Sequence, residues 1–201
     1  MKHSTIVNQL SDLKHRIFPR PFERLALEEL YDNSSKKNKL IGCEIGVYKA
    51  FHALSLLENS EIEKLYLIDP YEMYETYLEG HAHYGVDQVP LSDAHKEAIE
   101  RLKNYNDKIV WLNLMAEDAI EKIVEELDFV YIDGNHAYDF VKMDIQNYWP
   151  KLKCGGILGG HDFYNGYCRE HDGVIKAVSE FSVNNNLTLQ VELPDWWIKK
   201  P

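Results

Sequence analysis

The sequence predicts an α/β protein built on a doubly wound, mostly parallel β-sheet. The clearest evidence is the stretch 127–163, where the apolar run 129–132 is followed by a segment of helical period and then by the apolar run 157–158. The crossover in this strand–helix–strand unit has a length that suits parallel strands. A second unit of the same kind occupies residues 40–69, and the strands of both units end at acidic residues.

Seven strands and five helices are expected within residues 40–201. Short apolar or alternating runs bounded by turn-forming residues predict strands at 40–46, 65–68, 109–114, 129–132, 157–158, 187–193 and 196–198. Apolar residues three or four positions apart predict helices at 50–58, 92–102, 119–126 and 173–181, and in the segment that carries Val141, Ile145 and Trp149 and ends at Pro150. A Gly-Gly turn at 155–156 is expected to lead into the run 157–158.

Two segments lie outside this alternation. Residues 1–38 are predicted to form helices that cover the sheet, because one apolar stripe runs from Ile6 to Ile17 and a second from Phe22 to Leu30. A lid over the substrate is the functional alternative for this segment. Residues 39–201 are expected to form the main domain. The connection 71–108 is rich in Tyr and His, and connections of this length usually carry function. A substrate-facing loop is favoured there over a metal pair at His81 and His83, because histidines in polar loops are more often solvated.

Composition and charge disfavour several classes of function. The net charge of −11 and the pI of about 5.3 argue against a protein that grips nucleic-acid backbones, since such proteins are more often basic. No apolar run is long enough to span a membrane, and the N-terminus lacks the apolar core of a secretory signal. Three cysteines without a C-x-x-C pair indicate reduced thiols. We therefore expect a cytoplasmic protein that binds neither nucleic acid nor membrane.

The first strand–helix–strand unit has the features of a nucleoside site. Its first strand ends at Glu44-x-Gly46, and its second ends at Asp69, 25 residues after Glu44. In doubly wound folds a Gly-bearing turn lets a ligand approach the backbone, and an acid about 20 residues later accepts hydrogen bonds from ribose hydroxyls. A dinucleotide site requires a second glycine where this sequence has Tyr48. A nicotinamide cofactor is therefore disfavoured, and an adenosine without phosphate fits better.

Ionisable residues follow both strands of the second unit: Asp133 and His136 after one, His161 and Asp162 after the other. The carboxyl ends of parallel strands meet at one edge of the sheet, so these side chains are expected to lie close together. Carboxylates and imidazoles gathered there can bind a metal ion or move a proton. For any one of these residues alone a simple turn is the alternative, because Asp-Gly is common after strands. The recurrence at two strand ends favours a site.

Two further acids, Glu117 and Asp118, follow the expected strand 109–114. Acidic residues favour the first turn of a helix, because the helix N-terminus carries partial positive charge. The same acids could reach an adenine at the edge of the sheet. We expect at least one of them to cap the helix 119–126.

Four stretches together resemble the class I S-adenosylmethionine-dependent methyltransferases, and most closely methyltransferase-domain family 24, whose small members are related to metal-dependent O-methyltransferases. The stretches are GCEIGVYKAFHALSLLE, LYLIDPY, LDFVYIDGNHAYDFVKMDIQNYWPKLKCGGILGGHDF and WWIKK. The combination of IDGNHAY with GGILGGHDF is the most specific part, and the resemblance runs from about residue 40 to the end. It implies a Rossmann-like sheet of seven strands, mostly parallel with an antiparallel terminal strand.

The resemblance also implies S-adenosylmethionine as cofactor. The matching residues are Glu44, Gly46 and Tyr48 for its methionine part, Asp69 for the ribose hydroxyls, Glu117 and Asp118 for the adenine edge, and Asp133 beside the transferred methyl. Ala50 replaces a glycine that is usual in the first motif. Alanine is a small change that this position is expected to tolerate.

In the metal-dependent relatives an acid at the position of Asp133 and a carboxylate pair after the fifth strand bind a divalent cation. Here the pair is His161-Asp162, so the implied ligands are Asp133, His161 and Asp162. Magnesium prefers oxygen ligands, and the histidine therefore argues against it.

The implied reaction is O-methylation of a small-molecule acceptor, which needs a general base. His136 is the first candidate for this base and His161 the second. The alternative is a non-catalytic nucleoside-binding or regulatory domain that has kept the fold. A nucleic-acid methyltransferase is disfavoured by the charge and by the lack of an N/D-P-P-Y motif. The sequence leaves the oligomeric state open, a dimer included.

Overall fold

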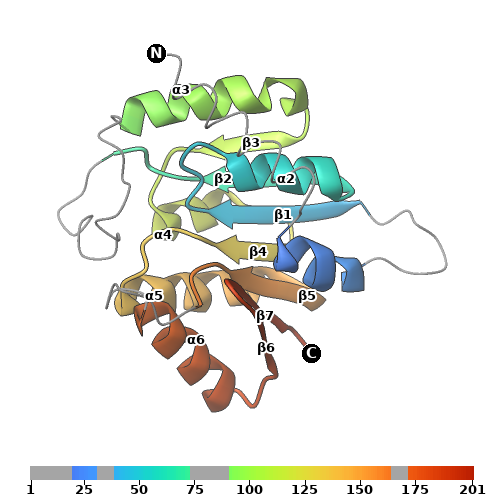
Figure 1. Ribbon diagram of the computed structural model, residues 1–201, viewed down its shortest axis with the longest axis vertical. Coiled ribbons are helices and arrows are strands. Elements are labelled where there is room, and N and C mark those ends of the chain that lie inside the picture. Colours follow the sequence, from blue (N-terminus) through green and yellow to red (C-terminus); the bar gives the residue numbers. More distant parts are fainter. Residues whose placement is uncertain (1–19, 31–38, 73–90, 164–171) are drawn as a thin grey trace.

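The computed structural model describes residues 20–30, 39–72, 91–163 and 172–201. Its centre is one seven-stranded sheet in the order β3-β2-β1-β4-β5-β7-β6 (Figure 1). The strands are β1 (Leu40–Ile45), β2 (Ile62–Ile68), β3 (Ile109–Leu112), β4 (Leu127–Ile132), β5 (Leu152–Gly160), β6 (Leu189–Glu192) and β7 (Asp195–Lys199). Each lies at one of the seven expected positions.

The direction of the strands confirms the expected fold class. The first five strands pair in parallel, and β7 is antiparallel to both of its neighbours, β5 and β6. From β1 the chain moves outward through β2 to β3 and then returns to β4 on the other side of β1. The carboxyl ends of β1 and β4 therefore flank a topological switch point, the position at which open α/β sheets bind ligands.

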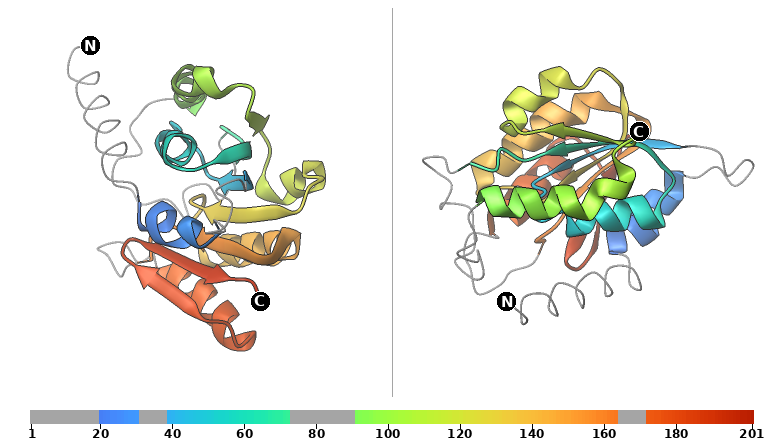
Figure 2. Two further views of the ribbon diagram at one scale, coloured as in Figure 1. Left: turned by 90° about the vertical axis from the view of Figure 1, so that its right-hand side faces the viewer. Right: turned by 90° about the horizontal axis from the view of Figure 1, so that it is seen from above.

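Helices cover both faces of the sheet (Figures 1 and 2). They are α2 (Phe51–Asn59), α3 (Leu91–Leu102), α4 (Ala116–Ala119), α5 (Tyr138–Tyr148) and α6 (Asp172–Asn184). One apolar cluster joins α2, α3 and the segment 20–30 to one face, and a second cluster joins α4, α5 and α6 to the other. The central strands β1 and β4 are buried along nearly their whole length, which explains why they appear in the sequence as continuous apolar runs.

The segment 20–30 is part of this core. The expected helical stripe at 22–30 forms a π-helical turn, η1 (Phe22–Ala26), and a 3₁₀ turn, η2 (Leu27–Leu30). The buried ring of Phe22 lies 4.8 Å from that of Tyr131, measured between centroids, and its backbone N–H donates to Asp195 at 3.1 Å. The other expected helix, with its stripe from Ile6 to Ile17, lies outside the described residues, and the boundary at residue 38 stays a prediction.

Two local expectations were wrong. The helix expected at 119–126 begins three residues earlier, as α4, and its 3₁₀ extension η5 (Ile120–Lys122) ends before β4 starts at Leu127. The acids Glu117 and Asp118 occupy the first turn of α4, as their charge favours, but neither makes a side-chain cap.

The second error concerns the glycines at 155–156, which lie inside β5 and not in a turn. Gly155 has φ +82° and coincides with a register shift between β4 and β5, so the pair forms an irregularity within one strand. Among the described residues, no helix is both long and apolar enough to cross a membrane.

Candidate functional site

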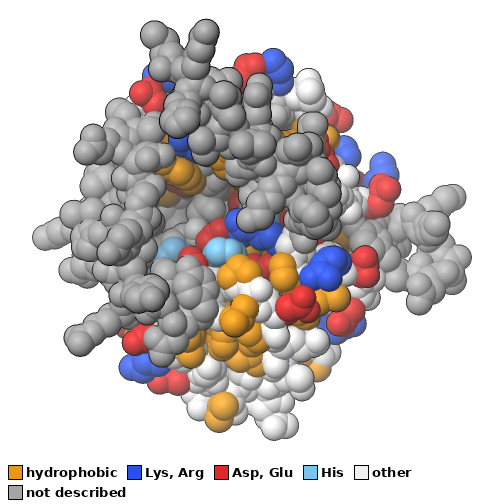
Figure 3. All heavy atoms as spheres, viewed as in Figure 1, with side chains coloured by type: hydrophobic (Ala, Val, Ile, Leu, Met, Phe, Trp, Pro, Cys, Tyr) orange, Lys and Arg blue, Asp and Glu red, His pale blue; other side chains and the backbone are white. Residues whose placement is uncertain are grey.

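A cavity of about 390 Å³ opens at the carboxyl edge of the sheet. It is lined by residues that follow β1, β2, β3 and β4, so it extends across the switch point. Its volume lies within the range of small-molecule sites. In the view of Figure 3, histidine, acidic and basic side chains gather near the centre beside apolar ones.

The turn after β1 forms the floor of this cavity. Gly46 has φ +85°, and a Cβ placed there would lie 2.2 Å from the backbone oxygen of Asp133. Only glycine allows the turn to lie this close to the end of β4. Tyr48 and Ala50 also have positive φ, of 46° and 58°. Left-handed backbone at residues with side chains is strained, and such strain concentrates at functional sites.

Asp69 holds this turn in place. One carboxylate oxygen, Oδ2, accepts hydrogen bonds from the backbone N–H groups of Val47 (3.0 Å) and Tyr48 (2.8 Å), and Oδ1 accepts one from Tyr71 (2.8 Å). Burial raises the pKa of Asp69, although these bonds oppose the shift. A carboxylate offers about four acceptor positions, so one remains for a ligand in the cavity. The residue expected to bind ribose therefore also shapes the turn.

Glu44 lines the cavity and belongs to a buried array that the sequence did not predict. The ring of His52, from α2, lies between two carboxylates: its Nδ1 is 3.5 Å from Glu44 and its Nε2 is 3.3 Å from Glu23. Glu23 also accepts a hydrogen bond from Ser55 at 2.8 Å. Burial raises the pKa of Glu44 well above its usual range and that of Glu23 to about 7. Glu23 belongs to the N-terminal segment, which carries no recognisable motif.

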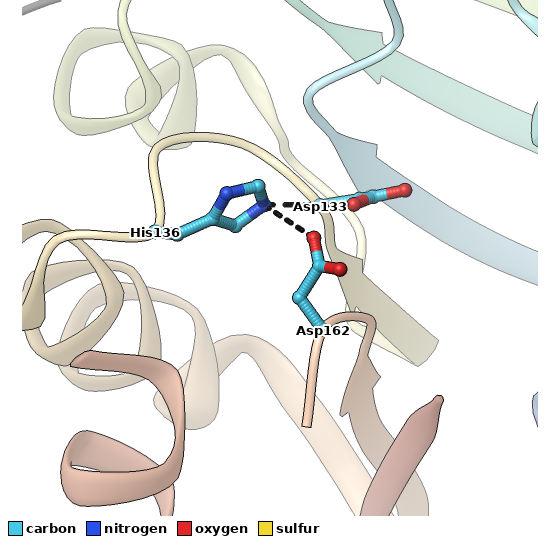
Figure 4. A group of neighbouring side chains, drawn as sticks. All are labelled: Asp133, His136 and Asp162. Atoms are coloured by element: carbon cyan, nitrogen blue, oxygen red, sulfur yellow. Dashed lines mark ion pairs between the residues drawn. The ribbon is translucent and has the colours of Figure 1, made fainter. Parts of the chain in front are cut away.

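The carboxyl-edge cluster, made of Asp133, His136, His161 and Asp162, lies at the β4 and β5 end of the cavity. Figure 4 shows Asp133, His136 and Asp162. Asp133 and His136 line the cavity itself. His136 Nε2 lies 2.9 Å from Asp162 and 3.8 Å from Asp133, and His161 Nδ1 lies 3.1 Å from Asp162 and 3.8 Å from Asp133. The structure thus brings all four predicted residues together.

These contacts change the protonation of the cluster. Burial alone would favour neutral imidazoles, but the carboxylates outweigh it, raising the pKa of His136 to about 10 and that of His161 above its usual value. The same pairing outweighs the effect of burial on the acids and lowers the pKa values of Asp133 and Asp162. At neutral pH the cluster therefore holds two carboxylates and the protonated ring of His136.

Arg20 contributes a further charge to this end of the cavity. Its guanidinium donates to the hydroxyl of Tyr131 at 2.7 Å and pairs with Asp133 at 3.3 Å. Tyr131 in turn donates to the buried Asp195 at 3.0 Å. The sequence did not predict these contacts, because Arg20 and Asp195 are far from β4 in the chain and follow no motif.

The donor atoms of the cluster fit a cation. One ligand atom from each of Asp133, His136 and Asp162 lies within 4.8 Å of the other two. Among the described residues, these three form the group that could hold a metal ion. The sequence predicted His161 in place of His136, and His161 also lies within ion-pair distance of both acids. A mixed set of carboxylate oxygens and imidazole nitrogens suits a transition-metal ion better than magnesium.

The far end of the cavity, near β3, is lined by Met115, Ala116 and Glu117. Asp118 is exposed and is not among the lining residues. Of the two acids expected near an adenine, Glu117 is thus the one in position. The histidines His81 and His83 lie outside the described residues.

Comparisons with known proteins agree with this geometry. The sequence model of a family described as "Methyltransferase domain" matches residues 41–163. An uncharacterized protein of Acanthamoeba polyphaga mimivirus, R132, is 22% identical over 153 residues, covering 75% of this chain. The chain spans 64% of that relative's length.

Solved structures show the same fold at low sequence identity. The O-methyltransferase NovP has a TM-score of 0.60 at 15% identity, with 89% of this chain and 79% of NovP covered. Cofactor-bound Rv0187 from MTB has a TM-score of 0.64 at 11% identity, with 97% and 88% covered. SMU.1697c of Streptococcus mutans, in complex with SAH, has a TM-score of 0.58 at 16% identity, with 92% and 99% covered.

The family match covers more than half of the chain, including the strand-end acids and all four residues of the carboxyl-edge cluster. The structural neighbours establish the fold. The chain therefore belongs to this methyltransferase-domain family and carries a class I S-adenosylmethionine-dependent methyltransferase domain.

Proposed function

We propose that this chain transfers the methyl group of S-adenosylmethionine to a hydroxyl of a small-molecule acceptor. The observation that carries the proposal is the position of the carboxyl-edge cluster, which lies at the β4 and β5 end of a cavity extending across the switch point. The O-methyltransferase activity named for NovP and the net charge of −11 support an acceptor hydroxyl on a small molecule.

In this proposal the cofactor lies along the edge of the sheet, against the strand-end residues that line the cavity. Its methionine part lies over Gly46 and Tyr48, with Glu44 beneath, and its ribose hydroxyls meet the remaining acceptor position of Asp69. The adenine then extends toward Glu117. This order brings the sulfonium methyl next to Asp133, whose negative charge favours the positive sulfonium.

Methyl transfer is a direct displacement, so the protein's main task is alignment of the acceptor oxygen with the methyl and sulfur. We propose that the acceptor hydroxyl binds beside His136, with His136 as the base and His161 as the second candidate. Because the pKa of His136 is about 10, its ring must first release a proton before it can accept one. A divalent cation held by Asp133, His161 and Asp162 would lower the pKa of the acceptor hydroxyl and would leave His136 as the base.

The test is a transfer assay with S-adenosylmethionine that carries a labelled methyl and a panel of phenols, catechols and sugars. We expect a labelled product that gains one methyl, and a loss of about 100-fold or more in Asp133→Ala at saturating cofactor. Asp139→Ala, which removes an exposed carboxylate from the first turn of α5, is the matched control. Full transfer by Asp133→Ala would refute the assigned role. Cofactor binding without transfer to any acceptor would favour the non-catalytic alternative.

A further inference from the structure

Asp144 is a buried acid that the proposed mechanism leaves unused. It lies in the middle of α5, is 4% exposed and lines the cavity. No hydrogen bond or ion pair joins its carboxyl to any other described residue. Because the side chain of Asp144 lines the cavity and its carboxyl bonds to no described residue, this carboxyl is available to a ligand that binds there.

The surroundings of Asp144 include apolar residues at the β3 end of the cavity. One turn further along α5, Tyr148 donates to the backbone oxygen of Ala116 at 2.8 Å and so ties α5 to the start of α4. Asp144 therefore stands opposite the β3 end of the cavity, where Met115 and Phe140 supply apolar walls. A flat aromatic ring fits between such walls, and its polar edge needs partners of matching character.

Asp144 and Glu117 supply such partners in two different forms. Burial and then the charge of Glu117 raise the pKa of Asp144 to about 8, so its carboxyl is protonated at neutral pH and can donate a hydrogen bond. Glu117 is exposed and offers an acceptor. The edge of adenine carries an amino group that donates and ring nitrogens that accept.

We propose that the carboxyl group of Asp144 donates a hydrogen bond to a ring nitrogen of the cofactor's adenine, and that it makes the site specific for this base. The inference rests on the proposed function, because it requires that the cavity binds S-adenosylmethionine. It adds a specificity-determining residue from α5 to the residues of the strand ends.

The first test uses calorimetric titration with S-adenosylhomocysteine. Asp144→Leu keeps the size of the side chain but removes the donor, and we expect its affinity to fall roughly 10- to 100-fold. Asp144→Asn, which keeps a donor, recovers most of the affinity. Asp139→Leu, an exposed position on the same helix, is the control, and thermal unfolding verifies that each variant is folded.

The pH dependence separates this role from simple packing. The wild-type affinity should decrease as pH rises through about 8, because Asp144 then loses the proton that it donates. The ionisable groups that face Asp144 are Glu117 on α4, Cys43 on β1 and Tyr148 on α5, and all are retained in Asp144→Asn. The difference between wild type and Asp144→Asn therefore reports Asp144 alone. A parallel decrease in both proteins would contradict the proposal.

Analogues of S-adenosylhomocysteine test the contact without any substitution. We expect one of the 1-deaza, 3-deaza and 7-deaza analogues to bind the wild type about 10-fold more weakly than the others, and to lose nothing further in Asp144→Leu. If the wild type binds S-adenosylhomocysteine and Asp144→Leu binds it equally well, the inference about Asp144 is wrong while the proposed function stands. If the wild type binds no S-adenosylhomocysteine, the proposed function itself fails.

Discussion

Replacing Gly46 by alanine should remove cofactor binding, and Gly155 provides a matched control. Both glycines have φ between +82° and +85°, so alanine at either position is strained by about 1–2 kcal/mol. They differ in their surroundings. A Cβ at Gly46 would lie 2.2 Å from the backbone oxygen of Asp133 and 2.5 Å from the Cα of Gly134, whereas a Cβ at Gly155 meets nothing within 4 Å.

The difference between the two variants isolates the close approach of the turn to β4. Backbone atoms cannot rotate away as a flexible side chain does, so the added methyl at Gly46 forces a shift that costs about 1–3 kcal/mol more. We therefore expect Gly155→Ala to lose about 1–2 kcal/mol of unfolding free energy and Gly46→Ala about 2–5 kcal/mol. The shift would also move the turn after β1 away from the residues that follow β4, and both segments line the cavity. The affinity for S-adenosylhomocysteine should therefore fall at least about tenfold.

Urea unfolding measures the first effect and calorimetric titration the second. Gly155→Ala should bind S-adenosylhomocysteine like the wild type, because Gly155 lies outside the cavity. If Gly46→Ala also bound it with unchanged affinity, the cofactor would not lie against this turn. Equal destabilisation of the two variants would show that the close approach of Gly46 to the end of β4 does not affect the free energy of unfolding.

Three further predictions follow from buried groups. Asp69→Ala leaves three backbone N–H groups without their acceptor, so affinity for S-adenosylhomocysteine should fall about tenfold or more, whereas the exposed Asp107→Ala should have no effect. Phe22→Ala should cost about 3–5 kcal/mol of unfolding free energy in a denaturation experiment, because its ring is fully buried. Glu23→Gln should become more stable than the wild type as pH rises.

The sign of the last effect follows from the raised pKa. Below pH 4.5 Glu23 is protonated in both the folded and the unfolded wild type, and between pH 4.5 and about 7 only the unfolded state releases the proton. The wild type therefore loses about 3 kcal/mol over this window, and Gln does not. Other buried acids contribute equally to both proteins, so the difference in denaturation midpoints should grow with pH. A difference independent of pH would contradict the assignment.

The sequence predicts the sheet well, because its signals are local. The runs that form β1 and β4 are buried on both faces, and the helical period of Val141 and Ile145 reflects the face of α5 that packs on the sheet. The helix placed at 119–126 was wrong because the acids at 117–118 mark its first turn, and the apolar pattern alone sets its boundaries poorly.

The site residues could be predicted where they belong to the segment that follows the end of a strand. Asp69 and Asp133 are of this kind, since the topology alone brings strand ends together. Arg20, Glu23 and Asp195 reach the site through tertiary packing of distant segments, and no spacing in the sequence reveals such contacts. The protonation of His136 likewise depends on distances to two carboxylates that only the folded chain defines.

The most direct test of the account is calorimetric titration of the protein with S-adenosylhomocysteine, with NAD as comparison, and with divalent cation present or chelated. The account predicts that S-adenosylhomocysteine binds at one site and that NAD does not, since Tyr48 and the turn at Gly46 leave little room for a pyrophosphate. A dependence on the cation would support a metal-assisted O-methyltransferase. Absence of S-adenosylhomocysteine binding under every condition would contradict the assignment of the cavity to this cofactor.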